Sequence, residues 1–359
     1  MTVLLHARRQ PLLEAFREIL DAFWADLDWN RGVFLKPNIV FAARPDSGAI
    51  TPPALVATLV RALRERDGSL DIVMGDGVAV GRDPRRNFQV SGYARLSRDL
   101  DVPLVDLHEA ERAPVAWDYG ELAAPAVALD RVYVNLPILK YSSACIISGA
   151  LKNQKGILLP EVKKEYHRLG LHERIAALNA AVRPSLTIMD CSRFFGPNVL
   201  ISGDNCGEVD AAACRLLGID QPEHVRLSRQ AGVFEEGFSV VGEEGTLERI
   251  AARPAASEAK TLGRLRLWSN PQACTGCRAL LADAKADLLR PGNFRAKRKL
   301  IGCSVKGAEM IMGRNAQWRE EHDTVFCVGS CTRDVAREHG YIYVPGCPPD
   351  LNDLYGCLP

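Results

Sequence analysis

The residues in this chain best suited to chemistry are cysteines near its C-terminal end. Cys274 and Cys277 are separated by two residues, and Cys303, Cys331 and Cys347 follow at longer intervals. Each lies in a turn next to a short stretch that we expect to form a β-strand. Turns after parallel strands open onto the same edge of a sheet, so these thiols are expected to meet in space. Converging thiolates are typical of zinc sites and iron–sulfur clusters.

A single Cys-x-x-Cys pair is compatible with zinc, an iron–sulfur cluster or a redox disulfide. Structural zinc sites often use two close pairs, whereas this region has one, which favours the cluster. Turn amides and helix N-termini at strand ends also stabilise thiolates and bridging sulfides. We therefore predict a 4Fe-4S cluster bound by Cys274, Cys277, Cys331 and Cys347, with Cys303 as a substitute ligand or an active-site thiol.

The chain contains 11 cysteines in 359 residues, and several lie in apolar or helical stretches. A free cysteine in such a stretch behaves as a small buried hydrophobic residue. This interpretation applies to Cys145, Cys191, Cys214 and Cys327. In a reducing cytoplasm, which we expect for this chain, cysteines serve more often as ligands than as disulfides.

Polar residues at the ends of strands predicted in the first domain form a second candidate site. Ligands of parallel sheets bind at this edge. Lysine ammonium groups could hold a carboxylate or a phosphate there, because each is a point charge with three donors. We expect Lys36 and Lys152 to hold the anion in the reaction. The further substrate contacts that we expect come from Asn38, Asp76, Lys140, Asn153 and Asp190.

Two histidines, His167 and His172, are candidates for proton transfer, because imidazole titrates near neutral pH. A predicted break at Gly170 separates them, so they need not share a helix face. The alternative for each is an ordinary surface histidine, and for the lysines a solvated surface charge. No dinucleotide fingerprint, phosphate loop or serine elbow is found.

The pattern of strands and helices predicts two α/β domains. Residues 1–252 alternate strands and helices, which indicates a mostly parallel sheet covered by helices. Residues 253–262 are small and polar and are expected to form a linker. Residues 263–359 restart the pattern as a smaller parallel α/β domain, with a strand at Lys299–Gly302 and a helix at Val305–Met312. Thr51 is expected to cap a helix that runs to about Arg66.

Composition excludes several classes of protein. The chain is 47% hydrophobic and 25% charged, with a formal charge of +1. A net charge this close to zero does not create the positive electrostatic field that attracts nucleic acid or an anionic membrane. No apolar run approaches the length that spans a bilayer, and the basic residues near the N-terminus stand in the wrong order for a secretory signal.

Several stretches of the first domain resemble the family that carries the domain of unknown function 362 (DUF362). They are Leu35–Asn38, Leu151–Gly156, Gly170–Ile175, Val182–Asp190 and Gly203–Ala211. The resemblance implies an α/β fold and an association with iron–sulfur modules, which agrees with the cysteine pattern. The chain lacks the Cys-x-x-Cys-x-x-Cys run of members with a ferredoxin-type insert, so its cluster is expected in the C-terminal domain.

These observations predict an iron–sulfur protein, a redox or cluster-assisted enzyme that acts on an anionic small molecule. A ferredoxin-like protein is expected as electron donor. Two alternatives stay open: a non-catalytic electron-transfer or cluster-carrier protein, and a zinc-stapled binding module.

Overall fold

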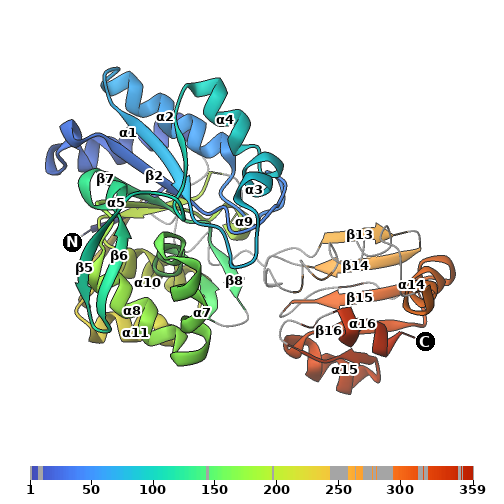
Figure 1. The fold of residues 1–359 in the computed structure, drawn as a ribbon. Coiled ribbons are helices and arrows are strands. Elements are labelled where there is room, and N and C mark those ends of the chain that lie inside the picture. The colour runs from blue at the N-terminus through green and yellow to red at the C-terminus, as the bar shows by residue number, and fades with distance from the viewer. Residues whose placement is uncertain are drawn as a thin grey trace. The chain divides into compact units, whose positions relative to one another are not determined.

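The structure is a computed structural model that groups into two compact units (Figure 1). The first comprises residues 1–139 and 148–253, and the second comprises residues 140–147 and 254–359. The described residues are 2–6, 11–142, 145–195, 198–242, 258–262, 264–269, 277, 280, 294–313, 318, 322–346, 349 and 351–358. Among these residues, no helix has both the length and the apolar character needed to cross a bilayer.

The first unit is built on an eight-stranded sheet with the order β12-β1-β11-β10-β7-β2-β3-β4. The five strands from β10 to β4 run parallel to one another, whereas β11 is antiparallel to both of its neighbours. The mostly parallel α/β architecture that the sequence predicts is therefore confirmed. In sheet order the strands are Ser239–Gly242, Thr2–His6, Leu200–Gly203, Leu186–Asp190, Val132–Leu136, Val33–Pro37, Ile72–Asp76 and Leu104–Asp106.

The central strands are buried on both faces, as their unbroken apolar runs require. Val33 and Leu35 of β2 pack in one core with apolar residues of helices α1 (Leu12–Phe23) and α2 (Pro53–Arg66). Phe34 alternates to the opposite face, where its ring lies 5.2 Å from that of Tyr133 of β7. The Tyr133 hydroxyl donates to Gln154, so this second face carries the segment that follows β7.

The remaining helices of the first unit connect these strands. They are α3 (Pro84–Val90), α4 (Tyr93–Leu100), α5 (Ala126–Asp130), α6 (Ala150–Asn153), α7 (Pro160–Leu169), α8 (Leu171–Ala181), α9 (Ser192–Phe195), α10 (Cys206–Leu217) and α11 (Glu223–Gln230). A short two-stranded sheet, β5–β6 (Arg112–Trp117 and Gly120–Pro125), accompanies them. Strands β8 (Lys140–Ser142) and β9 (Ile146–Ser148) form another two-stranded sheet, most of which belongs to the second unit.

Thr51 does not cap α2, contrary to the sequence-based prediction. The helix begins at Pro53 with Pro52 at its N-cap position. The Thr51 hydroxyl instead accepts from the Asn38 amide (3.0 Å) and donates to the Leu136 carbonyl (2.6 Å). Thr51 therefore joins the ends of β2 and β7.

The second unit has a five-stranded sheet with the order β13-β14-β15-β16-β17, parallel from β14 onward. The strands are Glu258–Leu262, Leu265–Ser269, Ala308–Met312, Val325–Val328 and Ile342–Val344, and the helices are α14 (Phe294–Lys306), α15 (Arg333–His339) and α16 (Leu351–Cys357). Strand β13 occupies residues that the sequence analysis assigns to the linker. The predicted boundaries of the domains stay a prediction.

Two elements of this unit differ from the prediction. Residues 299–302 are helical, within α14, because Leu300 and Cys303 lie three positions apart and bury one helix face. Residues 308–312 form β15 rather than a helix, and all five of them are buried between neighbouring strands. A short apolar run does not distinguish a buried strand from a buried helix.

Candidate functional site

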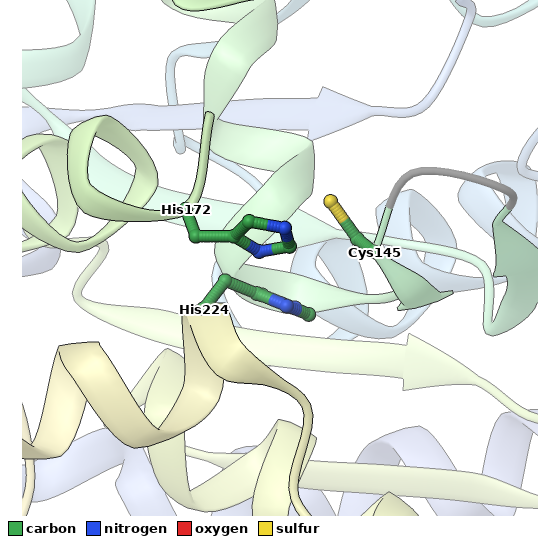
Figure 2. Close-up of side chains that lie close together, drawn as sticks. All are labelled: Cys145, His172 and His224. Atoms are coloured by element: carbon green, nitrogen blue, oxygen red, sulfur yellow. The ribbon is translucent and has the colours of Figure 1, made fainter. Parts of the chain in front are cut away.

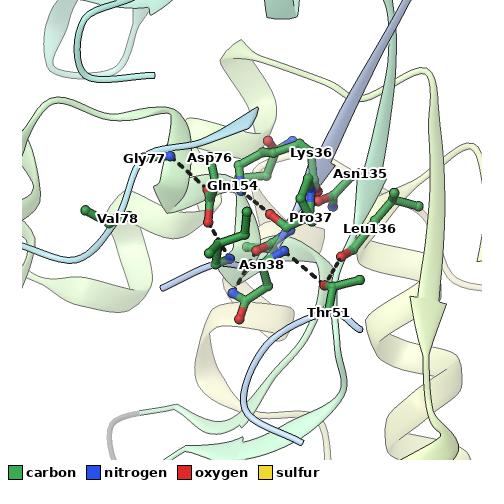
Figure 3. Close-up of polar contacts among 12 residues, drawn as sticks. Lys36, Pro37, Asn38, Thr51, Asp76, Gly77, Val78, Asn135, Leu136 and Gln154 are labelled. Carbon is green, nitrogen blue, oxygen red and sulfur yellow. Dashed lines mark hydrogen bonds and ion pairs between the residues drawn. The ribbon is translucent and has the colours of Figure 1, made fainter. Parts of the chain in front are cut away.

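A buried ion pair joins the ends of β2 and β3 (Figure 3). Lys36 Nζ lies 2.8 Å from Asp76 Oδ1, and the two side chains are 0% and 3% exposed. The second carboxylate oxygen, Oδ2, accepts from the Ile39 amide at 2.7 Å, and the Gly77 amide donates to Oδ1 at 3.0 Å. The pair therefore fixes the loops after both strands, and Lys36 is a positioning residue in this arrangement.

The backbone of Gly156 packs directly against this ion pair, which explains why the segment Leu151–Gly156 ends in glycine. A β-carbon at Gly156 would lie 2.1 Å from Asp76 Oδ1 and 2.5 Å from Lys36 Nζ. A β-carbon at Gly77 would lie 2.3 Å from the Gly156 carbonyl oxygen. Any larger residue at either position would displace buried atoms, so the two backbones depend on glycine for their approach.

A chain of side-chain amides runs beside the pair. Asn38 Nδ2 donates to Asn153 Oδ1 (2.9 Å), and Asn153 Nδ2 donates to Asn135 Oδ1 (2.8 Å). Asn135 Nδ2 in turn donates to the Ala150 carbonyl (3.2 Å). These bonds tie the strand ends of β2 and β7 to helix α6. The structure thus brings the predicted residues Asn38, Asp76 and Asn153 together with Lys36.

Asp210 of α10 holds the start of α6, a contact that the sequence analysis does not predict. Its carboxylate accepts from the Ala150 amide (2.6 Å) and from the Leu151 amide (3.0 Å), and its side chain is fully buried. Burial raises its pKa to about 7, although these amides lower it. Lys152 follows directly and is half-buried, so Asp210 sets where this lysine stands.

Lys163 of α7 is a buried amine with a lowered pKa, and nothing in its sequence context predicts this. Its Nζ donates to the carbonyls of Gly77 (2.8 Å) and Val78 (3.0 Å) and lies 3.0 Å from His108 Nε2. Burial is the first cause that lowers its pKa to about 7. The pKa of His108 is also lowered, first by burial and then by Lys163.

An excess of positive charge surrounds Lys163. Lys36, Lys155 and Arg112 all act on it to lower its pKa, and Asp76 opposes them. A second carboxylate, Asp106, acts on the neighbouring His108. Basic groups are therefore gathered in this partly desolvated region, where they could pair with an anion.

The other predicted residues of the first site lie on other elements. Asp190 ends β10, is 4% exposed and accepts from the Ser192 amide, and burial raises its pKa. Lys140 begins β8 and is also buried. His172 is the second residue of α8, next to His224 of α11. The backbone of His167 lies in α7, and its side chain is outside the described residues.

In the second unit, Cys277 lies beside the turn after β16. A β-carbon at Gly329 would lie 3.1 Å from Cys277 Sγ and 3.8 Å from the carbonyl oxygen of Gly346. The Ser330 amide donates to that same carbonyl (3.0 Å), which joins the turns after β16 and β17. Both glycines adopt positive φ angles, 89° and 107°, so both turns favour glycine.

Of the predicted cluster ligands, Cys277 and Cys331 are within the described residues, and Cys274 and Cys347 are outside them. Cys331 follows Ser330 and is exposed. Cys303 was predicted at a strand end, which is wrong: it lies in α14 and is 5% exposed among apolar side chains. Burial also raises the pKa of the Cys303 thiol. Its position is that of a core residue.

Comparison with known proteins places the first unit in a family. A family described as Domain of unknown function (DUF362) matches residues 33–221, more than half of the chain. The chain belongs to the DUF362 family. The match includes the ion pair, the amide chain and Asp210, and it confirms the resemblance that the sequence motifs indicate. The family description names no reaction.

The chain is similar to a curated relative and to a solved structure. The thylakoid-associated protein sll1697 of Synechocystis sp. is 30% identical over 167 residues, which cover 44% of this chain and 50% of the relative. The chain therefore matches half the length of that relative. The lactate racemase apoprotein of Thermoanaerobacterium thermosaccharolyticum is similar with a TM-score of 0.35 and 12% identity, over 90% of this chain and 70% of that chain.

Taken together, the site geometry is consistent with a metal- or cofactor-associated protein. Buried thiols and imidazoles supply soft and borderline ligands, and the first unit supplies positive charge.

Proposed function

We propose that this protein is an iron–sulfur enzyme that acts on an anionic small molecule. The second unit would bind a 4Fe-4S cluster through Cys274, Cys277, Cys331 and Cys347. The observation that carries the proposal is the short distance between Cys277 and Gly329. A β-carbon added at Gly329 would lie 3.1 Å from Cys277 Sγ. This approach brings one thiol of the Cys-x-x-Cys pair to the turn that contains Cys331.

The residues around Cys277 fit a cluster. The turns that precede Cys331 and Cys347 are joined by the bond from the Ser330 amide to the Gly346 carbonyl. Glycine at position 329 leaves room beside Cys277 Sγ, which would lie 3.1 Å from a β-carbon at this position. A bound cluster would supply electrons or, if held by three thiolates, an open iron that acts as a Lewis acid.

The first unit would bind and orient the substrate. Lys152, positioned by Asp210, would pair with its anionic group, and the Lys36–Asp76 pair would fix the surrounding loops. Lys163 and His108 would exchange protons, because both pKa values are lowered toward or below neutral pH. Roles of His167 and His172 in proton transfer stay predictions from the sequence.

Anaerobic purification followed by iron and sulfide analysis tests the proposal. The wild-type protein is expected to be brown, with about four irons per chain, as a 4Fe-4S cluster requires. Cys277→Ala should lose most of the iron. Cys303→Ala, a matched buried thiol of the same unit, should keep it. A colourless wild-type protein that contains a single zinc ion would contradict the proposal and favour the zinc-stapled module.

A non-catalytic electron or cluster carrier is the second candidate, because Cys331 is exposed and would leave the cluster accessible to a partner. In either case a ferredoxin-like protein is the proposed electron partner. Reduced thiols fit a reducing compartment, so we propose the cytoplasm. Lys152→Ala separates the candidates: substrate turnover should fall in an enzyme, whereas the rate of electron transfer by a carrier should not change.

A further inference from the structure

Two histidines of the first unit meet at the starts of helices α8 and α11. Gly170, with φ of 108°, allows the chain to turn sharply between α7 and α8, so His172 becomes the second residue of α8. Pro222 precedes α11 and places His224 at the equivalent position. The two helices pack on each other, and the ring centroids are 5.9 Å apart (Figure 2).

Three of the four ring nitrogens of this histidine pair are buried and have no hydrogen-bond partner among the described residues. His224 is 0% exposed, and neither of its ring nitrogens has a hydrogen-bond partner in the part of the chain that the structure describes. The same holds for His172 Nδ1. Buried polar atoms are usually satisfied, and orphaned ones indicate an absent ion, water or ligand.

The second nitrogen of His172 has a carboxylate neighbour. Its Nε2 lies 3.5 Å from Glu223 Oε2, at the first residue of α11. A carboxylate on one imidazole nitrogen orients the ring and increases the basicity of the other, as in many metal sites.

We propose that His172 Nδ1 and His224 bind a divalent transition-metal ion of the zinc class. Imidazole is a preferred ligand for zinc, copper, iron and nickel ions. Two imidazoles leave coordination positions for further ligands, and an anion in one of them would pair with Lys152. This site uses none of the proposed cluster cysteines.

Zinc titration of the full-length chain, carrying Cys277→Ala and Cys331→Ala to silence the cluster thiols, tests this site. A chromophoric chelator would report the affinity. We expect one zinc ion per chain, lost in His172→Ala and in His224→Leu. Glu223→Gln should weaken binding by about 10–100-fold, the usual effect of removing a partner of a ligand. His339→Ala, an exposed histidine of α15, should bind zinc like the parent.

A thermal unfolding assay distinguishes a loss of zinc binding from a loss of folding. Zinc is expected to raise the melting temperature of the parent but not that of His224→Leu. Without zinc, the leucine variant should be at least as stable as the parent, because it removes unsatisfied buried nitrogens. His172→Ala, at a side chain that is 22% exposed, provides an independent loss of binding should the buried variant unfold. No zinc bound by the parent, or unchanged affinity in both histidine variants, would overturn the proposal.

Discussion

The buried pair of Lys36 and Asp76 makes a sharp prediction about stability. Removing one partner of a buried ion pair costs about 3–5 kcal/mol, because the other charge stays desolvated and uncompensated. After Lys36→Met, the Asp76 carboxylate keeps the amides of Ile39 and Gly77 as donors. After Asp76→Asn, the Lys36 ammonium keeps the Pro37 carbonyl, a weaker contact at 3.4 Å. We therefore expect Asp76→Asn to destabilise the first unit more than Lys36→Met.

Calorimetry measures this destabilisation as a decrease in the melting temperature of the first unit. A loss of about 3 kcal/mol for Lys36→Met and about 5 kcal/mol for Asp76→Asn lowers the melting temperature by about 6–20 °C in a unit of this size. The double variant should lose less than the sum of the two single variants, because it leaves no unpaired charge.

A matched control is the exposed pair of Arg61 and Glu65, whose atoms are 2.9 Å apart. Arg61→Met should change the melting temperature little, because solvent screens exposed ion pairs. Should Lys36→Met and Asp76→Asn shift the melting temperature no more than this control does, the pair would not support the strand ends as we describe.

Three further changes have definite expected outcomes. Gly156→Ala places a methyl group against the ion pair and should cost about 1–3 kcal/mol in the free energy of unfolding, measured by urea denaturation; an unchanged midpoint would contradict the close approach. Lys163 has a folded pKa of about 7, below its ordinary 10.5, so the unfolded chain binds more protons between these values. The free energy of unfolding of the wild type should therefore rise with pH across this interval relative to that of Lys163→Met. Urea denaturation of both proteins at the two ends of the interval measures this difference, and equal values at both ends would contradict the lowered pKa. Gly329→Ala strains a backbone with φ of 89° and crowds Cys277, so it should lower the iron content after anaerobic purification, and full retention of iron would argue against a cluster at this turn.

Much of the fold can be predicted from the sequence because its signals are local. Leu186–Asp190 forms β10 and Leu171–Ala181 forms α8, and an unbroken apolar run and a glycine break mark these two elements in the sequence. Between Lys299 and Met312 the prediction is wrong, because the strand and the helix are interchanged and no local signal distinguishes them. Short apolar runs fit both structures, and only packing against neighbouring strands decides between them.

The candidate sites show the same division. Strand-end residues such as Asn38 and Asp76 are predictable, because parallel topology alone brings them to one edge. Lys163 and His224 are not, because their unusual surroundings come from distant segments: the carbonyls of Gly77 and Val78 for the lysine, and helix α8 for the histidine. Burial of a polar side chain is a tertiary property that a local pattern does not record.

Iron-edge X-ray absorption of the anaerobically purified protein tests the central claim most directly. If thiols from the Cys274–Cys277 pair and the turns after β16 and β17 bind one cluster, the spectrum should show an all-sulfur first shell and a second shell of neighbouring iron atoms. Cys277→Ala should remove both shells. An iron spectrum without iron neighbours, or zinc as the bound metal with a tetrahedral sulfur shell, would contradict the account.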